Sequence, residues 1–338
     1  MRKLLLGTTA LAAAATLSAN VALADVSISV YYEWRYESRS SNTTTLDGTQ
    51  FASDSEIKFV FSNKTDNGLD VSMKQEFLSD GGDSTVQESA LYISGGFGKI
   101  QLGSDDGIND GSIPIASNDL ISEEMLSTSK LNTADVTSAP LRIKDGDMAN
   151  LGGNSNKIAY YLPAMGGLTA GAAFTDGGEE GDADTTEFGA GYSMEAGGAS
   201  IYLSYVTGTT ENSTKDIDCS AMGVKVASGD ITFVIGQSQY EAENDDEQGT
   251  SAAVKFAVND GMTLAAYTAE VEDDISGEEY SNSGAELVYT IASGLKAIVT
   301  IEDYDYKKGT GSGAGLSLIH ISEPTRRRGI SYAVFCLK

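Results

Sequence analysis

Apolar and polar residues alternate along most of the chain after residue 24. Between residues 26 and 37 one face is polar and the other contains Val26, Ile28, Val30, Tyr32, Trp34 and Tyr36. The same alternation returns at residues 57–62, 69–74, 254–258 and 295–302. Because successive side chains of an extended strand point to opposite faces, these stretches predict β-strands with one apolar and one polar face.

Short glycine turns separate the predicted strands. They fall at Asn67-Gly68, Gly95-Gly96, Gly166-Gly167, Gly197-Gly198, Ser228-Gly229, Asp260-Gly261 and Ser293-Gly294. From Gly167 onward these turns are 31, 31, 32 and 33 residues apart, and each interval holds a strand, an acidic loop and another strand. Short turns at one end and long polar loops at the other are typical of an up-and-down transmembrane β-barrel, whose strands need only about 9–11 residues to span. The seven turns and the N-terminal segment predict fifteen native strands, and a closed barrel of even number needs a sixteenth.

Both ends of the chain differ from the part between them. Residues 1–24 have a charged start, an apolar stretch from Leu4 to Leu17 and a small-residue ending before Asp25, which is the order of a secretory signal peptide. An N-terminal membrane anchor is the alternative interpretation. Residues 316–338 resemble the translation of sequencing-library adaptor DNA, so we predict a foreign tail that has replaced the sixteenth strand. Rereading the source DNA beyond codon 315 would test this prediction. The native barrel is then residues 25–315.

One interval between turns is too long for a hairpin. Gly96 and Gly167 are 71 positions apart, and the excess falls at about Ser104 to Ser155, after the fifth strand. A connection of this length in a compact domain is either functional or contains a helix or strand that the pattern has been misread to omit.

Composition and charge exclude several classes of function. The chain has 49 acidic and 22 basic residues, so a basic footprint for nucleic acid is absent and we expect no nucleic-acid partner. Stretches of 18 apolar residues, which helical membrane spans require, do not occur after residue 24. The single histidine, His320, lies in the predicted foreign tail, which leaves no histidine for a Ser-His or Cys-His pair. We therefore expect a protein that is not an enzyme and has no catalytic residues.

The segment 156–168 has the sequence NKIAYYLPAMGGL and directly follows the long connection. It is similar to the pattern Asn-Arg-Ile-Xaa-Tyr-Tyr-Xaa-Pro-Xaa-Xaa-Gly-Gly of the general bacterial porins of Gram-negative outer membranes, in their alphaproteobacterial form. Together with the signal peptide, the opening strand from Asp25 to Tyr32 and the long connection after the fifth strand, it makes residues 25–315 resemble this family. The resemblance implies an all-β, sixteen-stranded antiparallel barrel, a homotrimer, and a long third loop that folds into the lumen and narrows it. The chain departs from the family at its end, which is Leu-Lys rather than an aromatic residue.

The alternation places a basic wall inside this barrel, made of Arg35, Lys58, Lys74 and Lys99. The inserted loop brings the opposite charge, from Asp105, Asp106, Asp110, Asp119, Glu123 and Glu124. The resemblance implies a pore constriction with a transverse field between wall and loop, because selectivity is set by charges at the narrowest point. The alternative is that the basic residues only neutralise nearby carboxylates.

These observations predict an outer-membrane porin for passive diffusion of ions and small hydrophilic solutes. We expect cation selectivity, because so many carboxylates concentrate cations at the pore mouths. Outer-membrane lipid and lipopolysaccharide are the expected surroundings. No cofactor is expected beyond weakly bound Ca²⁺ or Mg²⁺ at the acidic loops, and the sequence assigns no metal ligands. The alternatives are a solute-specific channel and a non-conducting barrel with an adhesive or structural role.

Aromatic residues complete the prediction, because interfacial girdles of tyrosine and tryptophan flank the apolar band of membrane barrels. The residues that suit such girdles are Tyr32, Trp34, Tyr36, Tyr160, Tyr192, Tyr202, Tyr205, Tyr267 and Tyr289. Some of them must instead pack at a subunit contact, and periodicity does not distinguish the two.

Overall fold

The fold is taken from a computed structural model of the chain. It describes residues 25–41, 48–78, 85–108, 113, 153–177, 183–211, 215–307, 312–322 and 327–328. Within these ranges no helix has the length and apolar character needed to cross a membrane.

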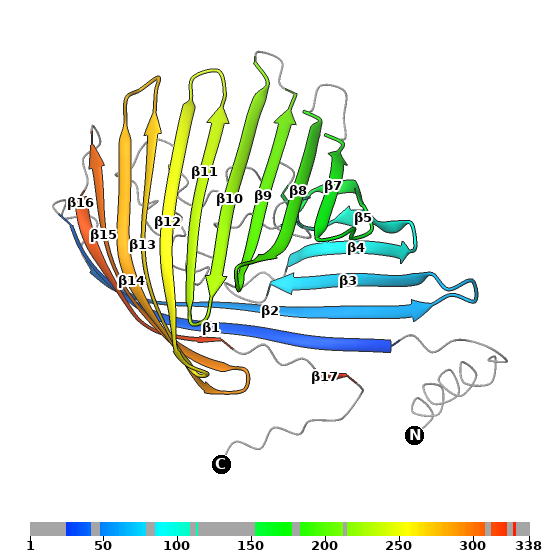
Figure 1. The fold of residues 1–338 in the computed structure, drawn as a ribbon, viewed down its shortest axis with the longest axis horizontal. Helices are drawn as coiled ribbons and strands as arrows, with labels where there is room; N and C mark the ends of the chain where they lie inside the picture. The colour runs from blue at the N-terminus through cyan, green and yellow to red at the C-terminus, as the bar shows by residue number, and fades with distance from the viewer. Residues whose placement is uncertain are drawn as a thin grey trace, which may run out of the picture.

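The described residues form one antiparallel β-sheet (Figure 1). Its strands are β1 (Asp25–Ser41), β2 (Gly48–Lys64), β3 (Asp70–Leu78), β4 (Thr85–Gly95), β5 (Gly98–Ser104), β6 (Asn156–Tyr161), β7 (Leu168–Thr175), β8 (Thr185–Ala196), β9 (Ala199–Thr210), β10 (Ile217–Ser228), β11 (Ile231–Glu241), β12 (Asp246–Asn259), β13 (Met262–Asp273), β14 (Glu279–Ala292), β15 (Leu295–Lys307), β16 (Ser312–Ser322) and the two-residue β17 (Arg327–Arg328). The predicted strand at residues 26–37 lies within β1, and the other four predicted stretches lie mainly within β2, β3, β12 and β15.

Each strand from β1 to β16 pairs with the next one along the chain, as in an up-and-down sheet. β16 pairs with β15 on one side and with β1 on the other, for example Tyr36 with Leu318. The last long strand is therefore joined to the first, which is the pairing of a sixteen-stranded barrel. All-β architecture and up-and-down topology are confirmed.

β16 shows where the C-terminal part of the chain lies. It begins at Ser312 and ends at Ser322, so residues 316–322 supply more than half of its length. The sixteenth strand that the barrel requires is thus formed by the stretch in which the predicted foreign tail begins. The foreign origin of residues 316–338 is a statement about the gene, and it stays a prediction.

The short turns lie where the glycine pairs predict them. At the first, between β2 and β3, the Thr65 amide donates to the carbonyl oxygen of Leu69 at 2.8 Å, and Gly68 has φ +87°. This backbone conformation is strained for any residue with a side chain, which explains the glycine. The long connection also lies as predicted, because β5 ends at Ser104 and β6 begins at Asn156.

The two faces of the sheet have opposite character. Apolar side chains on the outer face are exposed, among them Phe51 at 70% and Ile235 at 62%. Polar and charged side chains on the inner face are buried, among them Glu76 at 3% and Thr300 at 0%. This is the reverse of a water-soluble protein and is the arrangement of a barrel surrounded by lipid.

Two of the predicted girdle residues are on the wrong face. Tyr205 is exposed on the outer face of β9, but Tyr202 is three positions away and pairs with the inward Lys225 of β10. Tyr267 is 5% exposed and also faces inward. Because strand side chains alternate with a period of two, Tyr202 and Tyr205 cannot both face outward. Assigning Tyr202 and Tyr267 to the girdles was therefore wrong.

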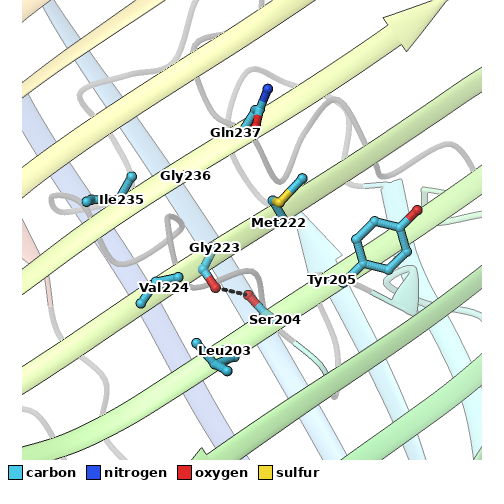
Figure 2. Close-up of a pocket in the computed structure, with 9 residues that line it drawn as sticks. All are labelled: Leu203, Ser204, Tyr205, Met222, Gly223, Val224, Ile235, Gly236 and Gln237. Atoms are coloured by element: carbon cyan, nitrogen blue, oxygen red, sulfur yellow. Dashed lines mark hydrogen bonds between the residues drawn. The ribbon is translucent and has the colours of Figure 1, made fainter.

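A shallow apolar groove of about 370 Å³ crosses the outer face of β9, β10 and β11 (Figure 2). Its walls are the side chains of Leu203, Tyr205, Met222, Val224, Ile235 and Gln237. Gly223 and Gly236 form part of its floor, where the Ser204 hydroxyl donates to the Gly223 carbonyl oxygen at 3.4 Å. The groove thus belongs to the apolar outer face and is separate from the lumen.

Candidate functional site

The basic residues of the inner wall are closely matched with carboxylates. The Lys58 ammonium on β2 forms an ion pair with Glu76 on β3, whose side chain is 4% exposed. Lys74 on β3 forms ion pairs with both Glu88 on β4 and Asp105, the first residue after β5. Cross-strand register explains the pairs between strands. Lys58 lies directly opposite Glu76, and Lys74 lies opposite Ala90, two positions from Glu88 on the same face of β4.

The Lys74 cluster, defined as Lys74, Glu88 and Asp105, is the most buried of these charge groups. No other hydrogen-bond donor among the described residues reaches Oε2 of Glu88 or Oδ1 of Asp105. Within this cluster, one ammonium therefore compensates two carboxylates at the root of the long connection.

The two ends of the long connection are held together by Lys157 of β6. Its ammonium donates to the carbonyl oxygen of Asp105 at one end and to that of Gly153 at the other. The Ser104 hydroxyl donates to the carbonyl oxygen of Asn154, which adds a second bond between the ends. We call these contacts the polar clasp. Lys157 is 4% exposed, so its hydrogen bonds are shielded from water.

Gln101 and Lys99 of β5 complete the inner surface beside this clasp. The Gln101 amide donates to the carbonyl oxygen of Asp106 at 3.3 Å. The Lys99 ammonium lies 4.2 Å from the centroid of the Tyr161 ring and 5.6 Å from that of Tyr92. Both distances are within the range of a cation–π interaction. The two aromatic rings thus help to position Lys99 on the inner wall.

The structure brings together part of the predicted site. Lys58, Lys74 and Lys99 face inward, and Asp105 and Asp106 lie at the start of the long connection, with Asp105 paired to Lys74. Arg35 lies opposite Ala52 at an inward position of β1, but its side chain is outside the described part of the structure. Four predicted carboxylates also lie outside the described residues: Asp110, Asp119, Glu123 and Glu124. The role of all these residues as a constriction stays a prediction.

The predicted site residues do not include two of the carboxylates that form ion pairs with the lysines, nor the lysine that joins the two ends of the long connection. Glu76, Glu88 and Lys157 were not named, although alternation within their strands would have placed each on the inner face. Their pairing depends on strand register, which alternation alone does not give. For Lys58 and Lys74 the neutralising alternative describes what the structure shows, and it weakens any field from this wall.

Carboxylates also occur on the remainder of the inner wall. Glu33 on β1, Glu187 on β8, Glu247 on β12 and Glu286 on β14 are each at most 5% exposed. Among the described residues, two groups of carboxylates have oxygens within 4.8 Å of one another: Glu88, Asp105 and Asp106 at the root of the long connection, and the more exposed Glu270, Glu272 and Glu279, which lie away from the inner wall. Binding of Ca²⁺ or Mg²⁺ stays a prediction, and the first group already holds the Lys74 ammonium.

Charged residues at the long-loop rim influence one another. Burial and the neighbouring carboxylates of Asp273, Asp246 and Glu278 raise the pKa of Asp245, in the turn between β11 and β12. The Lys215 ammonium donates to Glu241 at 2.9 Å, and this hydrogen bond raises the pKa of Lys215. The rim is thus a place where negative charge is crowded.

The apolar outer face, polar inner face and closed strand pairing together define a membrane channel barrel. Comparison with protein families agrees, because a profile described as Gram-negative porin matches residues 7–309. The chain belongs to this family and is an outer-membrane porin of a Gram-negative type. Among curated proteins, no sequence matches it.

Solved structures of porins share the fold. An anion-selective porin from Comamonas acidovorans has 14% identity and a TM-score of 0.61, covering 89% of this chain and 100% of its own. A mutant of the Rh. blastica porin has 17% identity and a TM-score of 0.62, with 88% and 99% covered. The trimer form of OmpT from Vibrio cholerae has 15% identity and a TM-score of 0.61, with 88% and 99% covered.

Proposed function

We propose that this porin is a cation-selective channel for passive diffusion of ions and small hydrophilic solutes. The observation that carries the proposal is the charge balance at the root of the long connection, where Lys74 faces both Glu88 and Asp105. Lys58 is likewise offset by Glu76. Once these lysines are offset, the remaining inner carboxylates and the chain's net charge of -27 attract cations.

The barrel itself does not decide the sign of selectivity, since the structurally similar Comamonas acidovorans porin is described as anion-selective. Selectivity depends on which charges face the water in the lumen, and these differ at 14% identity. The proposal therefore rests on this chain's own residues. The same reasoning assigns it no catalytic role, and porins are channels by family.

We also propose a homotrimer in outer-membrane lipid and lipopolysaccharide. The trimer form of the similar OmpT structure supports this assembly. The mass of the unheated protein in detergent, measured by light scattering with correction for bound detergent, tests it. A mass three times that of one chain is expected, and a monomeric mass would contradict it.

A planar-bilayer recording with a KCl gradient tests the channel function. We expect stepwise conductance that closes in thirds and a reversal potential of the cation-selective sign. An anion-selective reversal potential would overturn the selectivity but not the channel. Because surface charges are screened by salt, the selectivity should weaken as the KCl concentration rises.

A non-conducting barrel is the second candidate, and one observation favours it. Several inward side chains on the wall from β11 to β15 are almost completely buried, including Val234, Val271 and Thr300. A wide lumen filled with water would leave such side chains partly exposed. Folded protein that inserts into the bilayer without conductance would support this adhesive or structural role.

A further inference from the structure

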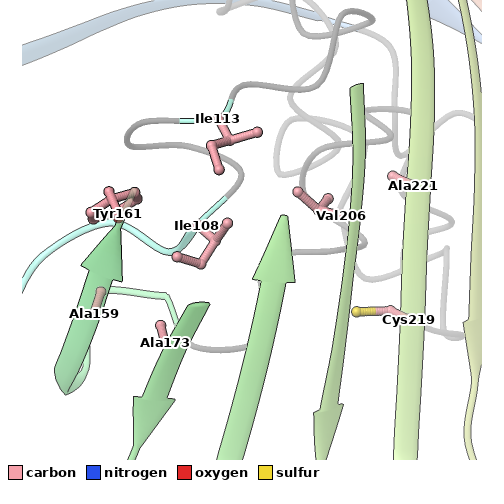
Figure 3. Packing of buried hydrophobic residues seen from close by; sticks show 8 residues of the cluster. All are labelled: Ile108, Ile113, Ala159, Tyr161, Ala173, Val206, Cys219 and Ala221. Carbon is pink, nitrogen blue, oxygen red and sulfur yellow. The ribbon is translucent and has the colours of Figure 1, made fainter. Parts of the chain in front are cut away.

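Two isoleucines of the long connection are buried inside the barrel. Ile108 and Ile113 are each 1% exposed, and they belong to an apolar cluster on the inner wall (Figure 3). Its wall residues come from β6, β7, β9 and β10: Ala159, Tyr161, Ala173, Val206, Cys219 and Ala221. Apolar side chains also face inward elsewhere, for example Val234 and Val271, but in this cluster they enclose two residues of the long connection.

Small residues make room for the two isoleucines. Gly189 of β8 lies opposite Gly171 of β7 in the sheet, and both belong to the inner face. A Cβ atom on Gly189 would lie 2.5 Å from Cγ2 of Ile108 and 2.8 Å from Cγ1 of Val206. Gly189 is not among the glycines with positive φ, so the close approach of Ile108, rather than the backbone, explains its missing side chain. We call this recess and its wall residues the apolar seat.

The apolar seat and the polar clasp bracket the first carboxylates of the long connection. Ile108 comes three residues after Asp105, whose carbonyl oxygen accepts from Lys157 and whose carboxylate pairs with Lys74. The Ile113 amide donates to the carbonyl oxygen of Ile108 at 3.2 Å, which links the two isoleucines directly. The clasp holds one side of the Asp105–Asp106 pair, and the seat holds the other.

We propose that Ile108, Ile113 and Gly189 are positioning residues that hold Asp105 and Asp106 in the lumen and thereby set the ion selectivity of the pore. Burial of apolar surface stabilises this position without adding a charge to the lumen. A purely polar attachment would be exchanged more readily with water. The effect on ion selectivity rests on the proposed channel function. The packing of the two isoleucines in the apolar seat can be tested without measuring conductance.

Cys219 supplies a reporter that already lies in the seat. It is not part of a disulfide among the described residues, its side chain is 3% exposed, and the chain has one other cysteine, Cys336. With Cys336→Ser as background, a small water-soluble methanethiosulfonate reagent should modify folded protein slowly. Ile108→Ala with Ile113→Ala should raise the rate about tenfold or more, because large-to-small changes at buried sites loosen packing. Gly189→Val should act in the same direction by displacing Ile108.

Matched variants separate the seat from general loss of structure. Ile235→Ala removes an exposed outer side chain, and Gly96→Ala adds a methyl group where nothing lies within 4 Å. Neither should change the modification rate. Ile108→Val should restore most of the protection, and heat-modifiable migration on a gel should show that each variant is folded.

The reversal potential then tests the positioning role. The seat variants should shift it toward lower cation selectivity, while both controls keep the starting value. Unchanged modification of Cys219 in folded Ile108→Ala, Ile113→Ala protein would overturn the seat. Faster modification with an unchanged reversal potential would overturn its role in selectivity. Absence of conductance from the folded protein would instead contradict the proposed function. It would leave the test of the apolar seat intact, because thiol modification does not depend on conductance.

Discussion

The Lys157 ammonium donates a hydrogen bond to the carbonyl oxygen of Asp105, a residue 52 positions earlier in the chain. The same ammonium also reaches the carbonyl oxygen of Gly153. A single side chain on a short strand thus fixes both ends of the longest connection in the protein. Because the bonds are made by a buried charged donor, they are stronger than bonds at an exposed site.

Lys157→Met should weaken this clasp. Methionine keeps most of the apolar length but donates no hydrogen bond. The carbonyl oxygens of Asp105 and Gly153 then lose their donor, and for the buried Asp105 oxygen this costs roughly 1–3 kcal/mol. The half-life of the heat-modifiable form in detergent at a fixed temperature should shorten. Lys296→Met, at an exposed position of β15, is the control and should behave as the parent protein does. Equal half-lives for the two variants would show that the clasp does not stabilise the barrel.

Lys74→Ala should increase cation selectivity. The change removes the positive charge shared by Glu88 and Asp105 and leaves two inner carboxylates without their ammonium. The reversal potential in a KCl gradient should therefore move further toward the potassium limit. Lys64→Ala breaks the exposed Lys64–Asp70 pair of 3.0 Å beside the first short turn and should leave the potential unchanged. A shift toward anions in the Lys74 variant would contradict the proposed charge balance.

Asp245→Asn should stabilise the protein at neutral pH. Burial and nearby carboxylates raise the pKa of Asp245 above its ordinary value of 3.8, so its ionised form is unfavourable in the folded barrel. The contribution of Asp245 to the free energy of unfolding is therefore fully present below pH 3.8 and is lost as the pH rises through the raised pKa. The variant should therefore have a longer unfolding half-life than the parent at about pH 7 and an equal one at about pH 3.

Asp260→Asn, in the short turn between β12 and β13, is the matched control for this pH experiment. It removes a carboxylate from the opposite rim and should not reproduce the pattern. A gain for Asp245→Asn that is the same size at both pH values would show that charge crowding is not its cause.

Chain length tests the role of β16. A chain ending at Gly315 loses the pairs Ile301–Leu316 and Val299–Leu318 with β15, and the pair Tyr36–Leu318 with β1. A chain ending at Ser322 keeps them. Unpaired backbone groups in lipid cost several kcal/mol each, so the shorter chain should fail to form the heat-modifiable barrel and the longer one should form it. β17 is absent from both chains, which isolates the contribution of β16. Equal folding would show that residues 316–322 are dispensable.

The channel and its residues were predictable from the sequence to different extents. Alternation and glycine turns predicted the strands, the direction of each face and the position of the long connection between Ser104 and Asn156. The prediction for Tyr202 failed because it was based on the aromatic residue type. The alternation of side chains within β9 places Tyr202 on the inner face. The same patterns named Lys58 and Lys74 but not the carboxylates that neutralise them.

The barrel follows from local patterns in the chain, namely a period of two and short turns between strands. The contacts between distant residues across the barrel do not follow from these patterns. Lys157 binds Asp105, and Ile108 packs beside Gly189, because strand register and closure bring distant segments together. No local pattern carries that register, since shifting one strand by two residues preserves every inward and outward position while changing every partner.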